Sequence, residues 1–228
     1  MNNQMKITKI VFLGALFVVS ATATQAQIII SEVDPAGSGN TDYGADWFEL
    51  QNTGSSAVNI TGWKMDDSSD KFGSAVPLAG VTSIAPGQFV VFIEDTGMTD
   101  STLNANFISA WFGGTAPAGL TIGNYGGSGV GLSTSGDAVN IFDSSGNAVT
   151  GVTFGTAPTG ATFDNSAGLS GAISQASVAG VDGAFLSTDG REVGSPGGVS
   201  PVPEPTSLAL AGLGLAGLIA CRQRGRKS

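Results

Sequence analysis

The chain has 228 residues, of which 35 are Gly and only 12% are charged, and its formal net charge at pH 7 is −9. It contains no His and a single Cys, which excludes a Ser–His–Asp triad, a Cys–His pair and a zinc site with imidazole ligands. The Gly content is about twice the usual ~7% and disfavours a helical bundle, whereas 41% hydrophobic residues are too many for a wholly disordered chain.

Residues 1–26 have the pattern of a secretory signal peptide. Lys6 and Lys9 supply the positive start, an apolar run of eleven residues follows, and small residues lead to a cleavage site between Ala26 and Gln27. An uncleaved N-terminal anchor is the alternative, but the run is short for a span of about 20 residues. We therefore expect this segment to be removed on export.

The segment from residue 27 to residue 200 has the pattern of a β domain. Apolar and polar residues alternate over short runs, and Gly, Asn and Pro turns separate the runs. The last two runs have matching lengths around the turn Asp143–Asn147, as in a hairpin. Helix is expected only near Asn104–Phe112. The pattern therefore predicts an all-β sandwich. The expected strands are 28–33, 47–52, 58–60, 62–65, 88–93, 137–142 and 148–154.

The same domain is strongly acidic and contains no Cys. Seventeen acidic residues stand against Lys64, Lys71 and Arg191, which gives a net charge of about −14. Because no basic patch is present, binding to DNA or RNA is disfavoured. Cys221 lies beyond the domain, so no disulfide can stabilise it and the apolar core must do so.

Several landmarks of the domain resemble the lamin tail domain family of bacterial proteins. They are Ile30–Val33, Trp47–Asn52, Ile60–Trp63, Pro86-Gly87, Asp143–Asn147 and Gly194–Gly197, in that order. The resemblance implies an immunoglobulin-like β-sandwich that serves as a non-enzymatic accessory or surface module. Residues 95–131 are longer and richer in Gly than the family pattern, and we expect them to form an insertion or long loop.

The final segment, residues 201–228, has three parts in a fixed order. The motif Pro203-Glu204-Pro205 comes first, and an apolar run over residues 206–221 follows it. As a helix this run would reach roughly 24 Å, short of a ~30 Å hydrocarbon core, although charged flanks can snorkel. A helix buried in a soluble core is the alternative, but it leaves the basic end unexplained. That end consists of Arg222, Arg224, Arg226 and Lys227, which should stay in the cytoplasm.

Motif, apolar run and basic end together resemble the PEP-CTERM sorting signal of Gram-negative bacteria. The resemblance implies that an exosortase, a membrane-embedded transpeptidase-like enzyme, recognises and removes the tail, and that the protein is associated with exopolysaccharide. We therefore expect an exported protein of the cell envelope or extracellular space. Before processing, a transmembrane helix would anchor it in the inner membrane with its C-terminus in the cytoplasm.

Clustered carboxylates raise the question of a bound metal. Asp66, Asp67 and Asp70 could offer oxygen ligands to Ca²⁺, but the Asp-x-Asp-x-Asp-Gly register and a distal bidentate Glu are missing. We therefore read these residues as solvated turn residues and expect no metal and no other cofactor, with Ca²⁺ as the alternative. A second acidic group consists of Asp34, Asp42 and Asp46.

Catalysis and glycan binding are the remaining possibilities. Glu32 and Glu49 could in principle act as an acid–base pair, but both lie on landmarks of the resemblance, where a structural role is simpler. No catalytic residue is assigned. Trp111 and Tyr125 are the candidate contacts for polysaccharide, through stacking of their rings on sugars.

Three functions follow, in order of preference. The first is an exported, non-enzymatic surface or matrix module, because no nucleophile–base pair is evident. The second is a polysaccharide-binding module that uses exposed aromatic side chains. The third is a divalent-metal-dependent hydrolase that uses carboxylates such as Glu49.

Overall fold

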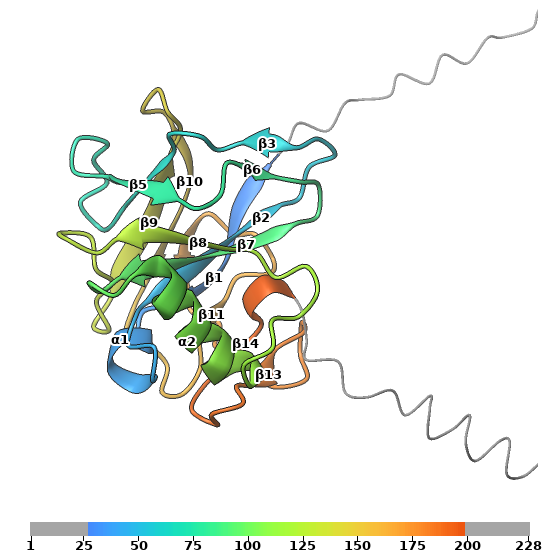
Figure 1. Ribbon diagram of the computed structural model, residues 1–228. Helices are drawn as coiled ribbons and strands as arrows, with labels where there is room; N and C mark the ends of the chain where they lie inside the picture. The colour runs from blue at the N-terminus through green and yellow to red at the C-terminus, as the bar shows by residue number, and fades with distance from the viewer. Residues whose placement is uncertain (1–26, 199–228) are drawn as a thin grey trace, which may run out of the picture.

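A ten-stranded sheet dominates the computed structural model, which describes residues 27–198. Two helices, a short 3₁₀ helix and two ribbons of two strands each accompany the sheet (Figure 1). In chain order the elements are β1 (Ile28–Asp34), α1 (Gly37–Asn40), β2 (Trp47–Asn52), β3 (Val58–Asn59), β4 (Lys64–Asp66), β5 (Val76–Ala79), β6 (Ser83–Ile84), β7 (Phe89–Asp95), α2 (Asp100–Phe112), β8 (Ile122–Gly126), β9 (Asp137–Phe142), β10 (Ala148–Phe154), β11 (Phe163–Asp164), β12 (Gly171–Ile173), β13 (Phe185–Leu186), β14 (Val193–Gly194) and η1 (Pro196–Gly198).

The sheet folds over on itself into two layers. The strand order is β11-β1-β2-β7-β8-β5-β4-β9-β10-β12, and β5 joins the layers because it pairs with β8 on one side and β4 on the other. Far from β5 the layers meet again: the rings of Phe154 in β10 and Phe163 in β11 have centroids 5.3 Å apart. This arrangement confirms the expected β-sandwich.

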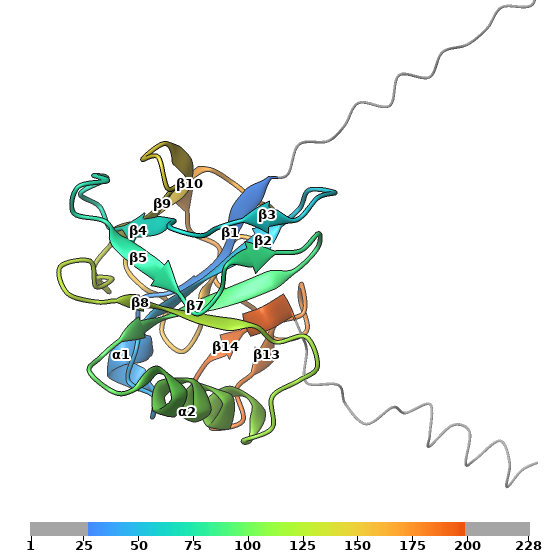
Figure 2. The ribbon, with the colours of Figure 1, turned by 45° about the horizontal axis from the view of Figure 1, so that its top comes forward.

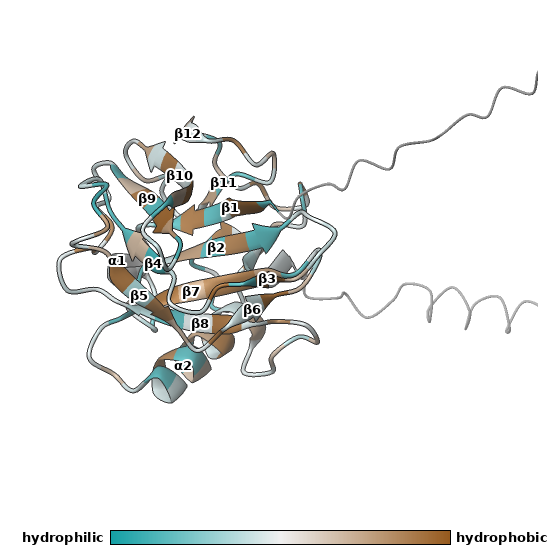
Figure 3. Ribbon diagram, turned by 90° about the horizontal axis from the view of Figure 1, so that it is seen from above, coloured by the Kyte–Doolittle hydropathy of each residue, from teal (hydrophilic) through white to brown (hydrophobic). Residues whose placement is uncertain are grey.

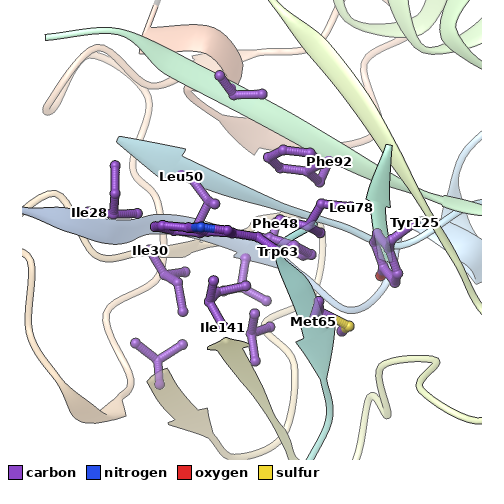
Figure 4. Packing of buried hydrophobic residues seen from close by; sticks show 14 of the residues in the cluster. Ile28, Ile30, Phe48, Leu50, Trp63, Met65, Leu78, Phe92, Tyr125 and Ile141 are labelled. Carbon is purple, nitrogen blue, oxygen red and sulfur yellow. The ribbon is translucent and has the colours of Figure 1, made fainter. Parts of the chain in front are cut away.

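The main core fills the space between the layers. Figure 4 shows Phe48 and Leu50 from β2 together with Met65 and Ile141 from the opposite layer. Phe48 stacks on Phe92 of β7 at 5.6 Å between ring centroids. Alternate residues of β2 and β7 point into this core, as the period of two requires.

The other face of β2 and β7 is covered by α2, which lies beneath the sheet in Figure 2. Trp47 and Ile93 point to this side and pack with Phe107 and Trp111 of the helix in a second apolar cluster. Because both faces are buried, β7 is almost continuously apolar, as its brown colour in Figure 3 shows.

Most of the expected strands are confirmed, but residues 95–131 differ from the expectation of a loop or insertion. They contain α2, which begins after Thr99 and includes the expected helical stretch, and β8. β8 runs parallel to β7 and antiparallel to β5, so it is an internal strand of the sheet, between these two. The segment is therefore part of the fold.

Candidate functional site

Two glutamates lie side by side inside the domain. Glu32 of β1 is opposite Glu49 of β2, because a bulge between Ile30 and Glu32 shifts the register of the strand pair. Each residue is only 1% exposed. We call these two residues the carboxylate clamp, because both hold residues 192–198, the closing segment.

Glu32 fixes the middle of the closing segment. Its Oε1 accepts hydrogen bonds from the backbone N–H of Ser195 at 2.8 Å and from the hydroxyl of Thr162 at 2.5 Å. Its Oε2 accepts a bond from the Ser195 hydroxyl at 3.1 Å. The Thr162 hydroxyl is also 2.6 Å from that of Ser177, so the site extends into the chain that precedes β13.

Glu49 fixes the end of the closing segment. Its Oε2 accepts a bond from the backbone N–H of Gly197 at 2.5 Å, and its Oε1 accepts one from the Ser31 hydroxyl at 2.7 Å. Gly197 has a φ of 79°, in the left-handed region that glycine adopts without strain. The two glutamates therefore bind two backbone N–H groups two residues apart.

Gly194 lets the closing segment approach this closely. A Cβ at this position would lie 2.5 Å from Oε1 of Glu32 and 2.9 Å from the Trp111 ring. A larger residue would push β14 away from the clamp. The Gly-Ser-Pro-Gly sequence of residues 194–197 is thus explained by contact with Glu32 and Glu49.

Burial changes the acidity of both carboxyls. Loss of solvation raises the pKa of Glu32 from 4.5 to about 7, although the bonds from Thr162 and Ser195 act in the opposite direction. Burial also raises the pKa of Glu49 well above its usual range, and the neighbouring charge of Glu32 adds to the effect. Protonation of either carboxyl relieves the repulsion between the two charges.

A second buried polar group ties the start of the closing segment to α2. The Tyr43 hydroxyl lies 3.4 Å from Oδ2 of Asp34 and 3.3 Å from Oε2 of Glu192. It accepts hydrogen bonds from the indole N–H groups of Trp47 and Trp111 at 3.1 and 3.3 Å. Burial, followed by the charge of Glu192, raises the pKa of Asp34 well above its usual range.

This arrangement can bind and hold, but it does not offer a catalytic centre. The clamp oxygens face donors from the protein itself, and neither glutamate is open to a substrate. Within residues 27–198, no three acidic or Cys side chains are placed to share a metal ion. A role in holding the closing segment is the chemistry that the geometry supports.

The two aromatic residues predicted to contact polysaccharide lie inside the domain, which contradicts that prediction. Trp111 is fully buried and Tyr125 is 1% exposed. Trp111 packs edge-on against Trp47 and Phe185, and Tyr125 packs against Phe48 in the main core. Trp111 faces the sheet from α2, and Tyr125 faces the main core from the internal strand β8. Neither ring is therefore available for stacking on a sugar.

One residue of the acidic turn differs from the prediction: Asp66 is not solvated, because the turn folds around its carboxyl group. Asp66 is buried, and its Oδ2 accepts bonds from the Ser69 hydroxyl and the Lys71 N–H at 2.6 and 2.7 Å. Asp67 accepts a bond from the Ser69 N–H at 2.8 Å, and Asp70 has a φ of 50°. These contacts are those of a tight turn.

Several predicted site residues lie outside the part of the chain that the structure describes. Gln27 is described and exposed, whereas Ala26 is not described. The same holds for the sorting motif Pro203-Glu204-Pro205, the apolar run and the basic end of Arg222, Arg224, Arg226 and Lys227. In residues 27–198, no helix is both long and apolar enough to cross a bilayer.

Sequence reasoning identified Glu32 and Glu49 as structural residues but did not connect them with the closing segment. The roles of Thr162 and Glu192 were missed, because they lie more than 100 residues from their partners in the chain. The sequence held one indirect indication of the contact with the closing segment. Two glycines flank Ser195-Pro196 at the end of the β domain, and glycines are typical of places where the backbone approaches another group closely.

Comparison with known families gives two matches. The Lamin Tail Domain model matches residues 21–156, and the model of the PEP-CTERM protein-sorting motif matches residues 201–227. No curated protein matches the chain. The structure adds residues 157–198 to the matched domain, because β11 pairs with β1 and the closing segment binds the clamp.

Proposed function

Because the chain belongs to the Lamin Tail Domain family and ends in a PEP-CTERM sorting motif, we propose that it is an exported, non-enzymatic module of the cell surface or extracellular matrix. The sorting motif indicates export to the cell envelope and processing by an exosortase. The observation that carries the proposal is the position of this motif, which starts three residues after the closing segment ends at Gly198.

The domain supports this role as a scaffold. Two of its buried acids, Glu32 and Glu49, accept hydrogen bonds that hold the closing segment. The tail is thereby attached to a stable body, which a surface module without disulfides needs. The family and the sorting motif are both non-catalytic, which is consistent with the absence of an enzymatic role in this proposal.

We propose the following division of the chain. Residues 1–26 act as a signal peptide and residues 27–200 form the mature domain. In the tail, Pro203-Glu204-Pro205 is the recognition motif, the apolar run spans the inner membrane before processing, and the basic end remains in the cytoplasm. The mature domain then stays with the exopolysaccharide of the cell surface.

Mass measurement of the mature protein tests the proposal. In cells with the exosortase, we expect the purified protein to lack both residues 1–26 and the apolar run. Deletion of residues 222–228 should leave the tail uncleaved and the protein in the inner membrane, because the cations that set its orientation are lost. Full-length protein in the cytosol of wild-type cells would overturn the proposal.

Fractionation of the surface material tests the association with exopolysaccharide. Mature protein should be recovered with the polysaccharide and released when the polymer is digested. In cells that make no polymer, it should appear in the medium. Retention on such cells at the wild-type level would show that another component holds it.

A further inference from the structure

The point at which the tail leaves the domain is fixed. Glu49 binds Gly197, and the next residue, Gly198, lies so close to Phe89 that an added Cβ would be 2.5 Å from its ring. The 3₁₀ helix η1 packs on β7 on the same side of the domain (Figure 2). The tail therefore starts from one place on the surface, beside the first residues of β7.

The tether between this place and the sorting motif is short. Four residues separate Gly198 from Pro203. Even fully extended, the chain between them reaches only about 18 Å. A folded domain of this length has a radius of gyration of about 16 Å and is therefore roughly 40 Å wide. Any enzyme that acts on the motif must come close to the domain surface around Gly198.

That surface contains an open groove with an unusual composition. Its volume is about 530 Å³, and its lining includes Ala85, Pro86, Gln88, Phe89, Gly119 and Gly198. No charged side chain lines it, although residues 27–200 carry seventeen acidic groups. Two other hollows on the described part of the chain, by contrast, each contain two Asp residues.

Resting on the proposed function, we propose that this exit groove is a docking surface for the outward-facing part of the exosortase that processes the tail. The tether length keeps the enzyme within about 18 Å of this surface. The lack of charge in the groove lets an uncharged protein surface bind there without desolvating carboxylates. The fitting partner surface is uncharged and convex, with apolar groups that contact Pro86 and Phe89.

A pair of Arg variants and a longer tether test the docking surface. Ala85 is exposed, and its hydrogen bonds to Gln88 use its backbone groups, so Ala85→Arg should fold normally. In pulse-chase experiments with the full-length protein, we expect Ala85→Arg to slow tail removal by about tenfold, because it adds a charge that must be desolvated at an otherwise uncharged surface. Ser145→Arg, in the exposed turn between β9 and β10, is the control and should be processed at the wild-type rate.

Insertion of about twelve Gly/Ser residues after Val199 adds roughly 40 Å of reach and should restore processing of Ala85→Arg. If Ala85→Arg is processed as fast as the control, or stays slow with the long tether, the docking surface is wrong. Failure of the wild-type protein to be processed at all is a separate outcome, which would overturn the proposed function itself.

Crosslinking identifies the occupant directly. With benzoylphenylalanine in place of Ala85, irradiation of cells that hold an exosortase variant able to bind but not cleave should yield an adduct of domain and exosortase. The same residue in place of Ser145 should yield none. Adducts to lipid alone at position 85 would show that the groove faces the membrane and would overturn the proposal.

Discussion

At the scale of single residues, the most informative feature is that two acids are buried where apolar side chains would be expected. Glu32 and Glu49 remain there because Ser195 and Gly197 each supply a backbone N–H, and hydroxyls supply further donors. Buried carboxyls without such donors would destabilise the fold. The main structural effect of the clamp is therefore to fix the closing segment in one position.

The raised pKa values predict a pH dependence of unfolding. The pKa of Glu32 is about 7 in the folded domain and 4.5 in the unfolded chain, so its protonation stabilises the fold fully below pH 4.5, and this contribution is lost as the pH rises through 7. Calorimetry should show a melting temperature that falls by roughly 5–10 °C from pH 5 to pH 8. Burial raises the pKa of Glu49 as well, which acts in the same direction.

The variant Glu49→Gln distinguishes the contribution of the carboxylate clamp to the pH dependence from that of the other acidic residues. Its amide can still accept from Gly197 and donate to Ser31, but it carries no charge beside Glu32. The melting temperature should therefore depend less on pH than in the wild type. Asp182→Asn also removes one negative charge, but at an exposed position, so its melting temperature should depend on pH as strongly as in the wild type. An unchanged slope in Glu49→Gln would assign the pH dependence to other groups.

Gly194 offers a steric test at the same scale. Ala at this position would place Cβ 2.5 Å from Oε1 of Glu32, so β14 or the carboxyl must move. We expect Gly194→Ala to lower the free energy of unfolding by about 2–3 kcal/mol in urea titrations. The control is Gly155→Ala, where no atom lies within 4 Å of an added Cβ. Equal stability of the two variants would contradict the close contact.

At the scale of elements, the strands with alternating or apolar runs were predictable, including β10 despite its Gly151, whereas β5 with its Pro77 and β8 with its Gly123 were not. β8 reads as Ile-Gly-Asn-Tyr-Gly, which is typical of a loop. The structure explains its glycine: a Cβ on Gly123 would lie 2.5 Å from the Phe92 ring and 2.6 Å from the carbonyl oxygen of Ala79. Gly123 therefore makes β8 look like a loop in the sequence, and the same residue allows β8 to pack against Phe92.

The helix α2 was expected near its true position, but its role was not. Trp111 docks it on the sheet by donating to Tyr43 at 3.3 Å and by packing edge-on against Trp47. Trp111→Phe keeps an aromatic ring and removes the donor, so the free energy of unfolding should fall by about 1–2 kcal/mol. Denaturant titrations would measure this. An unchanged stability would mean that the hydrogen bond to Tyr43 contributes nothing net.

At the scale of the whole molecule, the β-rich fold class was predictable, because it depends on composition and on the period of the apolar residues. The clamp was predictable only in part. Glu32 and Glu49 could be placed on neighbouring strands, but contacts with Thr162 and Ser195 join residues 130 and 163 positions apart. Such contacts depend on the complete topology, which no local pattern contains.

The last prediction concerns the size of the cooperative unit. A chain of residues 27–200 should unfold in one transition, because it contains the closing segment and the donors of the clamp. A chain of residues 27–190 lacks Glu192, Ser195 and Gly197 and leaves Glu32 and Glu49 buried without those partners. We expect it to show no cooperative transition by circular dichroism. A sharp transition in this shorter chain would show that the domain ends before residue 190.

The pairing of the first strand with the closing segment also has a consequence for timing. A polypeptide that crosses a membrane from its N-terminus delivers β1 first and Ser195 almost last. The domain therefore stays incomplete, and threadable, until nearly all of it has emerged. Its completion coincides with the arrival of the sorting motif, so a broken or prematurely ended chain fails to close and is left open to proteases. If the protein is exported as proposed, the need for Ser195 and Gly197 to complete the clamp thus favours intact molecules over truncated ones.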